Sequence, residues 1–206
     1  MNTDVLTFFE LNYAPGRVCL VGSHDPLYEL IRIAQSGLTI DGKPSKYNHA
    51  FLMSERRGSE QKIFILESDI HFSAKEFQII NGPQESLLEK WCLDSLDYAC
   101  VLGMDLAAGE QRKVIEQAVD LTYDVRRRYP IAELFGTLWA IITKTMGKKN
   151  VFDDQYAIQC ATMVRLCYQA INKDPLQGEI DDITNTSPER LAQSTRWTFR
   201  KEWKRM

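Results

Sequence analysis

The stretch Asp153–Ile171 has the sequence DDQYAIQCATMVRLCYQAI, which predicts a helix with a cysteine in its opening turn. Backbone N–H groups without partners and the helix dipole stabilise an anion at such a place, so a thiol there ionises more readily. Because a thiolate attacks carbonyl carbons, Cys160 is a candidate nucleophile, whereas Cys167 is expected to pack in the core. Apolar side chains follow at the spacing of one buried helix face, at Met163, Val164, Cys167, Tyr168 and Ile171.

Length and composition predict one domain. The chain has 206 residues, of which 44% are hydrophobic, and this suffices for a single domain over 1–206 with a substantial core. Residues 1–15 are expected to form a leader segment that lies on that domain. The net charge of −3 argues against a nucleic-acid binder, which would carry a basic excess.

Cysteine usage and hydropathy favour a reduced, cytoplasmic location. The five cysteines are irregularly spaced and form no CxxC pair, which argues against a zinc ribbon or a thioredoxin-type motif. The first residues are acidic and lack the basic start of a signal peptide. No apolar run approaches the ~20 residues that span a bilayer. We therefore expect a cytoplasmic protein without an integral membrane segment, and export without a signal peptide stays open.

The remaining pattern predicts an α+β fold with a central antiparallel sheet packed against helices. Two β-rich runs, Tyr47–Glu55 and Lys62–Asp69, flank the polar loop RRGSEQ and predict a hairpin. The asparagine, glycine and proline of Asn81–Pro83 are expected to stop a strand over Glu76–Ile80. Further strands are expected at Arg17–Gly22, Tyr98–Met104 and Arg196–Trp203. In the last of these, Trp197 and Phe199 are expected on one side. Helices are expected from Pro26 to near Gly37, at Glu85–Cys92, at Gly109–Arg128 and after Thr186–Glu189.

A nucleophilic cysteine needs a base beside the sulfur and a polar group that orients the base. Of three histidines, His49 is the best candidate, because it lies near the start of a strand. Glu67 follows an apolar run in the next strand, where its carboxylate can accept an imidazole N–H. His24 lies on the loop after the first strand and is a candidate for lining the pocket. Taken alone, His49 and Glu67 each favour an ordinary packing or surface role, and only their combination with Cys160 favours a site.

Three short motifs occur in a characteristic order along the chain: Asn48–Phe51 (NHAF), Leu66-Glu67 and Gln159–Val164 (QCATMV). Over about Gly16–Ser194, this order resembles the circularly permuted, papain-like NlpC-type amidases of the YiiX/YaeF kind, which are distantly similar to lecithin–retinol acyltransferase. The resemblance implies a permuted papain-like fold. Family members often have Ser-His-Val-Gly and Cys-Ser-Glu-Leu-Val at the first and third motifs, so the substrate pocket does not carry over.

The resemblance also implies a role for each residue of the site. Cys160 would be the nucleophile, His49 the base and then the acid, and Glu67 the group that orients His49. The backbone N–H of Cys160 would bind the oxyanion, with a second donor from Tyr47 or Tyr156. For both tyrosines, simple packing is the favoured interpretation.

We therefore expect a cysteine-dependent hydrolase, an amidase or peptidase that works through a thioester and needs no cofactor. The substrate would be a small molecule, a peptide or an acylated amine. An acyltransferase or lipid thioesterase on the same site, and an inert binding module with this fold, are the alternatives. A metal site from the three histidines and a cysteine matches no standard ligand spacing. Residues 131–146, apolar and flanked by basic residues, could contact lipid peripherally, but a core or lid helix is the favoured interpretation.

Overall fold

The computed structural model describes residues 1–73, 78–124, 159–178, 183 and 186–205 of the chain. The segment 131–146, for which a lipid contact and a core or lid helix were the two interpretations, and the side chain of Tyr156 lie outside these residues. In the described part, the helices are α1 (Thr3–Leu11), α2 (Pro26–Ala34), α3 (Ala108–Tyr123), α5 (Cys160–Gln169) and α6 (Pro188–Gln193), with short 3₁₀ helices η1 (Gln35–Leu38) and η2 (Leu88–Trp91). The strands are β1 (Val18–Ser23), β2 (His49–Arg57), β3 (Lys62–Ser73), β4 (Gln78–Leu87), β5 (Leu96–Gly103) and β6 (Phe199–Lys204).

The described strands form one antiparallel sheet in the order β4-β3-β2-β1-β5-β6. The expected hairpin is confirmed: β2 pairs with β3, with Phe51 opposite Glu67. Gly58 turns the chain between them with a φ of 76°, a conformation that favours glycine. The expected α+β class with a central antiparallel sheet is therefore correct.

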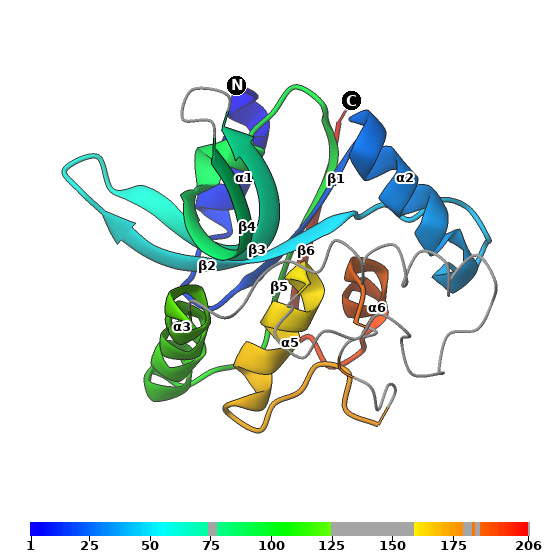
Figure 1. Ribbon diagram of the computed structural model, residues 1–206. Coiled ribbons are helices and arrows are strands. Elements are labelled where there is room, and N and C mark those ends of the chain that lie inside the picture. The colour runs from blue at the N-terminus through cyan, green and yellow to red at the C-terminus, as the bar shows by residue number, and fades with distance from the viewer. Residues whose placement is uncertain (74–77, 125–158, 179–182, 184–185, 206) are drawn as a thin grey trace.

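Helices cover both faces of the sheet (Figure 1). On one face α3, α5 and α6 pack over a core that includes Leu20, Leu52 and Val164. On the other face α1 and η2 pack over a second core, in which Val5 and Phe9 of α1 are fully buried. The first residues of the chain thus lie on the domain as a helix, which Asn2 caps by accepting from the amides of Asp4 and Val5.

The structure corrects the expectations around β4. Asn81, Gly82 and Pro83 do not end a strand: they lie inside β4, and Pro83 pairs with Ser68 of β3. β4 is at the edge of the described sheet, where a residue without an N–H is tolerated. The helix expected over Glu85–Cys92 is also wrong, because β4 continues to Leu87 and only the 3₁₀ turn η2 follows.

A smaller correction concerns the last strand. Trp197 and Phe199 were expected on one side of it, but Trp197 precedes β6 and packs against the core under α5, whereas Phe199 packs against the core on the opposite face. The helix expected after Thr186–Glu189 is confirmed as α6, with Ser187 accepting from the Arg190 amide as the N-cap.

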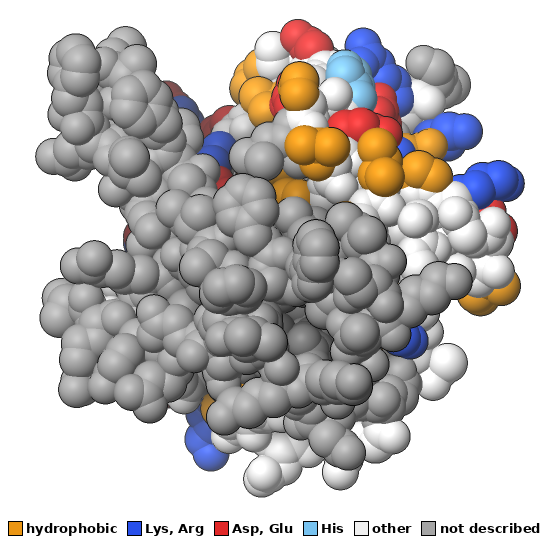
Figure 2. Space-filling view, turned by 45° about the vertical axis from the view of Figure 1, so that its right-hand side comes forward, with side chains coloured by type: hydrophobic (Ala, Val, Ile, Leu, Met, Phe, Trp, Pro, Cys, Tyr) orange, Lys and Arg blue, Asp and Glu red, His pale blue; other side chains and the backbone are white. Residues whose placement is uncertain are grey.

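The outer side of α2 carries exposed apolar side chains. Leu30 and Ile33 are exposed, and Ile40 beyond η1 is fully exposed. Figure 2 turns this side of the molecule forward and shows hydrophobic side chains there mixed with acidic and basic ones. None of the helices in the described part of the chain combines the length and the apolar character needed to cross a bilayer.

Candidate active site

Three segments that are far apart in the sequence bring Cys160, His49 and Glu67 together. His49 is the first residue of β2, Glu67 lies in β3, and Cys160 is the first residue of α5. All three side chains are buried. Side chains alternate along a strand, so His49 shares a face of β2 with Phe51, the residue opposite Glu67. Glu67 therefore reaches the imidazole diagonally across the hairpin.

The backbone at the start of β2 is held in place by its close approach to β1. A Cβ on Gly22 would lie 1.8 Å from the carbonyl oxygen of Lys46, so glycine is required there. Just before His49, the backbone N–H of Asn48 donates to the Val21 carbonyl at 2.9 Å. The side-chain amide of Asn48 donates to the Ser23 carbonyl at 3.1 Å. These bonds hold the backbone from which the His49 side chain projects.

The His49 imidazole interacts with both other members of the triad. Its Nε2 lies 3.0 Å from Oε2 of Glu67, which leaves Nδ1 for Cys160. Burial alone would lower the pKa of His49, but the charge of Cys160, hydrogen bonds with Cys160 and Glu67, and the charge of Asp69 outweigh it and raise the pKa to about 10. At neutral pH the imidazole is therefore held in its protonated, cationic form.

Both carboxylate oxygens of Glu67 are hydrogen-bonded. Oε1 accepts from the Lys90 ammonium at 2.7 Å. Oε2 accepts from Trp91 Nε1 at 2.7 Å as well as from His49. Burial raises the pKa of this carboxyl group, but the bonds and charges of His49 and Lys90 outweigh burial and lower it to about 2. Glu67 thus stays ionised and oriented toward His49.

Acid is expected to lower the free energy of unfolding, because it protonates the carboxylate of Glu67. Its pKa falls from the ordinary 4.5 to about 2 on folding, so the carboxylate stabilises the fold above pH 4.5 and this stabilisation is lost as the pH falls toward 2. The shift corresponds to about 3 kcal/mol of unfolding free energy. We expect urea unfolding to show this loss in the wild type and a smaller loss in Glu67→Gln. Equal acid sensitivity in the two proteins would contradict the assignment.

Aromatic rings enclose the imidazole. Trp91 stacks on His49 with ring centroids 4.4 Å apart and an interplanar angle of 22°. Tyr28 of α2 packs against Trp91 at 5.6 Å. Burial raises the pKa of Tyr28, and the charges of Asp69, Glu67 and Cys160 raise it further, so its hydroxyl stays protonated near the site. Among the described residues this hydroxyl has no hydrogen-bond partner, which leaves its proton free to be donated.

Helix α5 presents Cys160 at its N-terminus and is anchored further along. Gln159 is the N-cap residue, so the backbone amides of the first turn face the same end of the helix as Cys160. One turn later, the buried guanidinium of Arg165 holds both carboxylate oxygens of Asp174 at 3.0 and 3.1 Å from its Nε. This ion pair ties α5 to the segment that follows it and so fixes the direction in which the helix start points.

The proposed substrate-binding side chains are not brought to the triad by any contact that the structure describes. His24 is half exposed, and its Nδ1 lies 3.0 Å from Asp97. Tyr47 is buried in the core, and its hydroxyl interacts with Cys100 of β5. Tyr156 lies outside the described residues. Their substrate-binding roles stay predictions.

Sequence reasoning missed three residues of the site: Lys90, Trp91 and Tyr28. Lys90 and Trp91 belong to the turn η2, which was expected to be part of a longer helix. Tyr28 lies in the expected helix after the first strand. A Tyr, Lys or Trp carries no local signal for such a role. Only the folded chain identifies them, because η2 packs against β3 and Tyr28 of α2 packs against Trp91.

The described residues contain no cluster suited to a metal ion. Within that part of the chain, no group of three or more histidine, cysteine, aspartate or glutamate side chains is arranged to hold one. The two carboxylates nearest the triad, Glu67 and Asp69, are bridged by the ammonium of Lys90, with Nζ 2.7 Å from each. The cation that these two carboxylates bind is thus the ammonium of Lys90.

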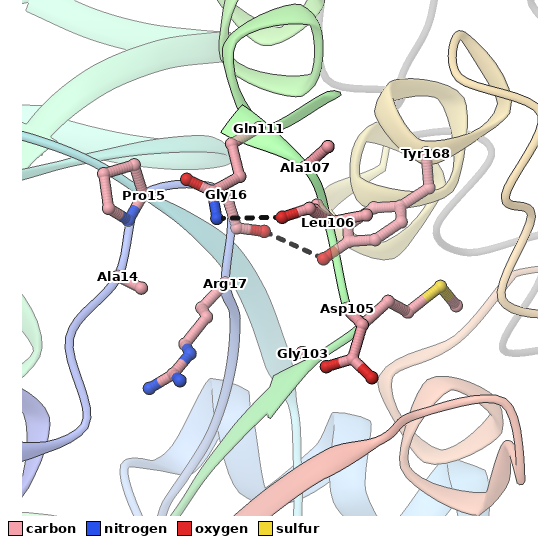
Figure 3. A pocket seen from close by; sticks show the side chains of 11 residues that line it. Ala14, Pro15, Gly16, Arg17, Gly103, Asp105, Leu106, Ala107, Gln111 and Tyr168 are labelled. Carbon is pink, nitrogen blue, oxygen red and sulfur yellow. Dashed lines mark hydrogen bonds between the residues drawn. The ribbon is translucent and has the colours of Figure 1, made fainter. Parts of the chain in front are cut away.

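The cavity drawn in Figure 3 lies at the other end of α5. Its volume is about 400 Å³, and its described lining includes Tyr168 but none of the triad residues. The Tyr168 hydroxyl donates to the carbonyl of Gly16 at 2.8 Å, and the Gln111 amide donates to the carbonyl of Leu106 at 3.3 Å. These polar groups are occupied by the protein itself, so the cavity does not extend the candidate active site.

No protein-family model matches the sequence, and no curated protein matches it. The fold is similar to the crystal structure of metalloprotein yiiX from Escherichia coli O157:H7, at 13% sequence identity and a TM-score of 0.55. The similarity covers 89% of this chain and 94% of that chain. At this identity the similarity shows the fold alone. It agrees with the YiiX part of the resemblance, and the relationship to permuted papain-like enzymes and to lecithin–retinol acyltransferase stays a prediction.

Proposed function

We propose that this protein is a thiol hydrolase, an amidase or peptidase on a circularly permuted papain-like fold. The observation that supports this most is the His49 imidazole, which contacts Glu67 through Nε2 and has Cys160 as its other partner. A nucleophile, a base and a group that orients the base are the parts of a catalytic triad. The order of the three along the chain matches the permuted arrangement.

In the proposed reaction, the Cys160 thiolate attacks the carbonyl carbon of an amide. The oxyanion that forms is stabilised by the backbone N–H groups at the start of α5. The protonated His49 then gives its proton to the leaving nitrogen, the carbon–nitrogen bond breaks, and a thioester on Cys160 remains. Water, deprotonated by the now neutral His49, attacks the thioester and releases the acid. Glu67 keeps the imidazole in its orientation throughout.

For the second oxyanion donor, Tyr28 is better supported than Tyr47 or Tyr156. Its hydroxyl has no hydrogen-bond partner among the described residues, and it interacts with the charge of Cys160. Tyr47 points its hydroxyl toward Cys100 instead. The substrate class we propose is an amide in a peptide, a peptidoglycan fragment or an acylated amine, followed by lipid esters.

The similar structure bears the name of a metalloprotein, so a metal on this chain needs its own test. The described residues do not fit such a site, because the ammonium of Lys90 bridges the two carboxylates next to the triad. The proposed reaction therefore assigns no step to a metal ion.

Acylation of Cys160 by an activated ester tests the proposal. We expect p-nitrophenyl acetate to give a burst of p-nitrophenol and an acetyl group on Cys160, located by peptide mass spectrometry after acid quench. Added methylamine separates the alternatives: an acyltransferase forms N-methylacetamide in preference to acetate. Wild-type protein that shows neither burst nor acylation would be an inert binding module, and the proposal would fail. The same assay with EDTA should give the same burst.

A further inference from the structure

Lys90 occupies an unusual position for a lysine. It lies in the short turn η2, and only 23% of its side chain is exposed. Its ammonium lies 2.7 Å from Oε1 of Glu67 and 2.7 Å from Oδ2 of Asp69. Burial lowers the pKa of Lys90, but the charges of Glu67 and Asp69 outweigh burial and raise it, so the group stays charged.

Lys62, which lies on the same strand as Glu67, differs from Lys90 in its exposure and in the burial of its partners. Lys62 is 45% exposed, and its Nζ lies 4.0 Å from Glu89 and 3.2 Å from Glu60. Exposed pairs of this kind contribute about 0–1 kcal/mol. Glu67, by comparison, is fully buried, and a buried carboxylate needs a compensating charge and bonded oxygens to remain ionised.

Two consecutive residues of η2 fix the carboxylate of Glu67 in one orientation. Lys90 binds Oε1, while Trp91 binds Oε2 and stacks on the imidazole of His49. Without Lys90, one oxygen of a buried carboxylate would lose its partner. The carboxylate would then be free to rotate or to take up a proton, and its bond to His49 Nε2 would weaken.

Asp69 completes the arrangement as the second carboxylate that binds the Lys90 ammonium. Asp69 is two residues from Glu67 on β3, almost fully buried, and holds the ammonium from the second side. The other titratable groups facing these carboxylates are His49 from β2, Cys160 from α5 and Tyr28 from α2. With Lys90 removed, Glu67 and Asp69 would face each other without a cation between them.

We propose that Lys90, held by Asp69, is a positioning residue of the active site that clamps Glu67 in the orientation in which it binds Nε2 of His49. This inference rests on the proposed thiol hydrolase. The clamp acts through Glu67 and makes no contact with substrate. Its loss therefore changes the rate of the chemical step and leaves substrate binding intact.

The test compares Lys90→Met with the control Lys62→Met, using p-nitrophenyl acetate. For Lys90→Met we expect kcat at pH 7 to fall about 10- to 100-fold, because a misplaced catalytic group costs about that much. The KM should change less than about 2-fold, and the acidic limb of the rate profile should move to higher pH as Glu67 becomes easier to protonate. Lys62→Met should change none of these. A folded Lys90→Met with wild-type kcat and pH profile would overturn the inference.

A second variant keeps the test decisive if Lys90→Met does not fold. Asp69→Asn keeps Lys90 but removes the charge that holds its ammonium from the second side, so the clamp on Glu67 should loosen. We expect kcat to fall while KM stays within about 2-fold of the wild-type value. A folded Asp69→Asn with wild-type kcat would overturn the inference. Failure of wild-type Cys160 to be acylated would instead refute the proposed function, so the two outcomes are distinct.

Discussion

Replacing His49 with alanine is expected to slow alkylation of Cys160 by iodoacetamide at pH 6 by roughly 100-fold or more. In the wild type the imidazole is held protonated beside the sulfur, and a cation beside a thiol favours the thiolate, which is the form that reacts with iodoacetamide. An ordinary thiol is less than ~1% ionised at pH 6. The measurement is the alkylation rate from pH 4 to pH 9, with the labelled peptide identified by mass spectrometry.

Two internal controls accompany this prediction. His24→Ala should leave the rate unchanged, because the His24 imidazole pairs with Asp97. Cys167 should stay unmodified until the protein unfolds, because it is fully buried and burial raises its pKa. A Cys160 that reacts no faster than Cys167, or equally fast with and without His49, would remove the nucleophile from the site.

The second large effect concerns Glu67→Gln, which should lower kcat about 100- to 10,000-fold while KM changes little. The substitution keeps the shape of the side chain but removes the charge that stabilises the imidazolium. If the amide turns its NH₂ group toward Nε2 of His49, a donor meets a donor and the imidazole loses its orientation. Activity should be compared at a neutral pH and temperature at which circular dichroism shows both proteins folded.

Glu85→Gln is the matched control for Glu67→Gln. Glu85 lies on the neighbouring strand β4, and its carboxylate pairs at 2.9 Å with the half-exposed Arg57. It undergoes the same chemical change outside the site and should keep the wild-type kcat. A Glu67→Gln enzyme with the wild-type rate would exclude Glu67 as the orienting group, and Asp69 would then be the next carboxylate to examine.

The sequence could predict the three candidate residues together with the elements that carry them, because each of these elements has a local signal. A cysteine at the start of an apolar helical pattern and two β-rich runs around a glycine loop are short-range features, and β2, β3 and α5 formed where they were expected. No local feature of the sequence predicts that Cys160, His49 and Glu67 come together in space. The expectation that they do so came from the order of the motifs along the chain, and the contacts of His49 support it independently.

The surroundings of the triad were not predictable, for a physical reason that η2 illustrates. Glycine and proline at positions 82 and 83 usually end a strand, but an edge strand tolerates them, so β4 ran on and displaced the expected helix. The turn that replaced it carries Lys90 and Trp91 to Glu67. Tertiary pairing of β4 with β3 decided this, and no window of the sequence contains that information.

The distances along the chain between the three residues also bear on when a reactive thiol exists. His49 and Glu67 are 18 residues apart and share one hairpin, a local structure that can form early. Cys160 enters only when α5, far downstream, docks against β2 and α3. Closing that long loop belongs to the slow, late part of folding. If Cys160 is the nucleophile that we propose, a newly made or partly unfolded chain carries it without its His49 partner, and only complete folding brings the two together.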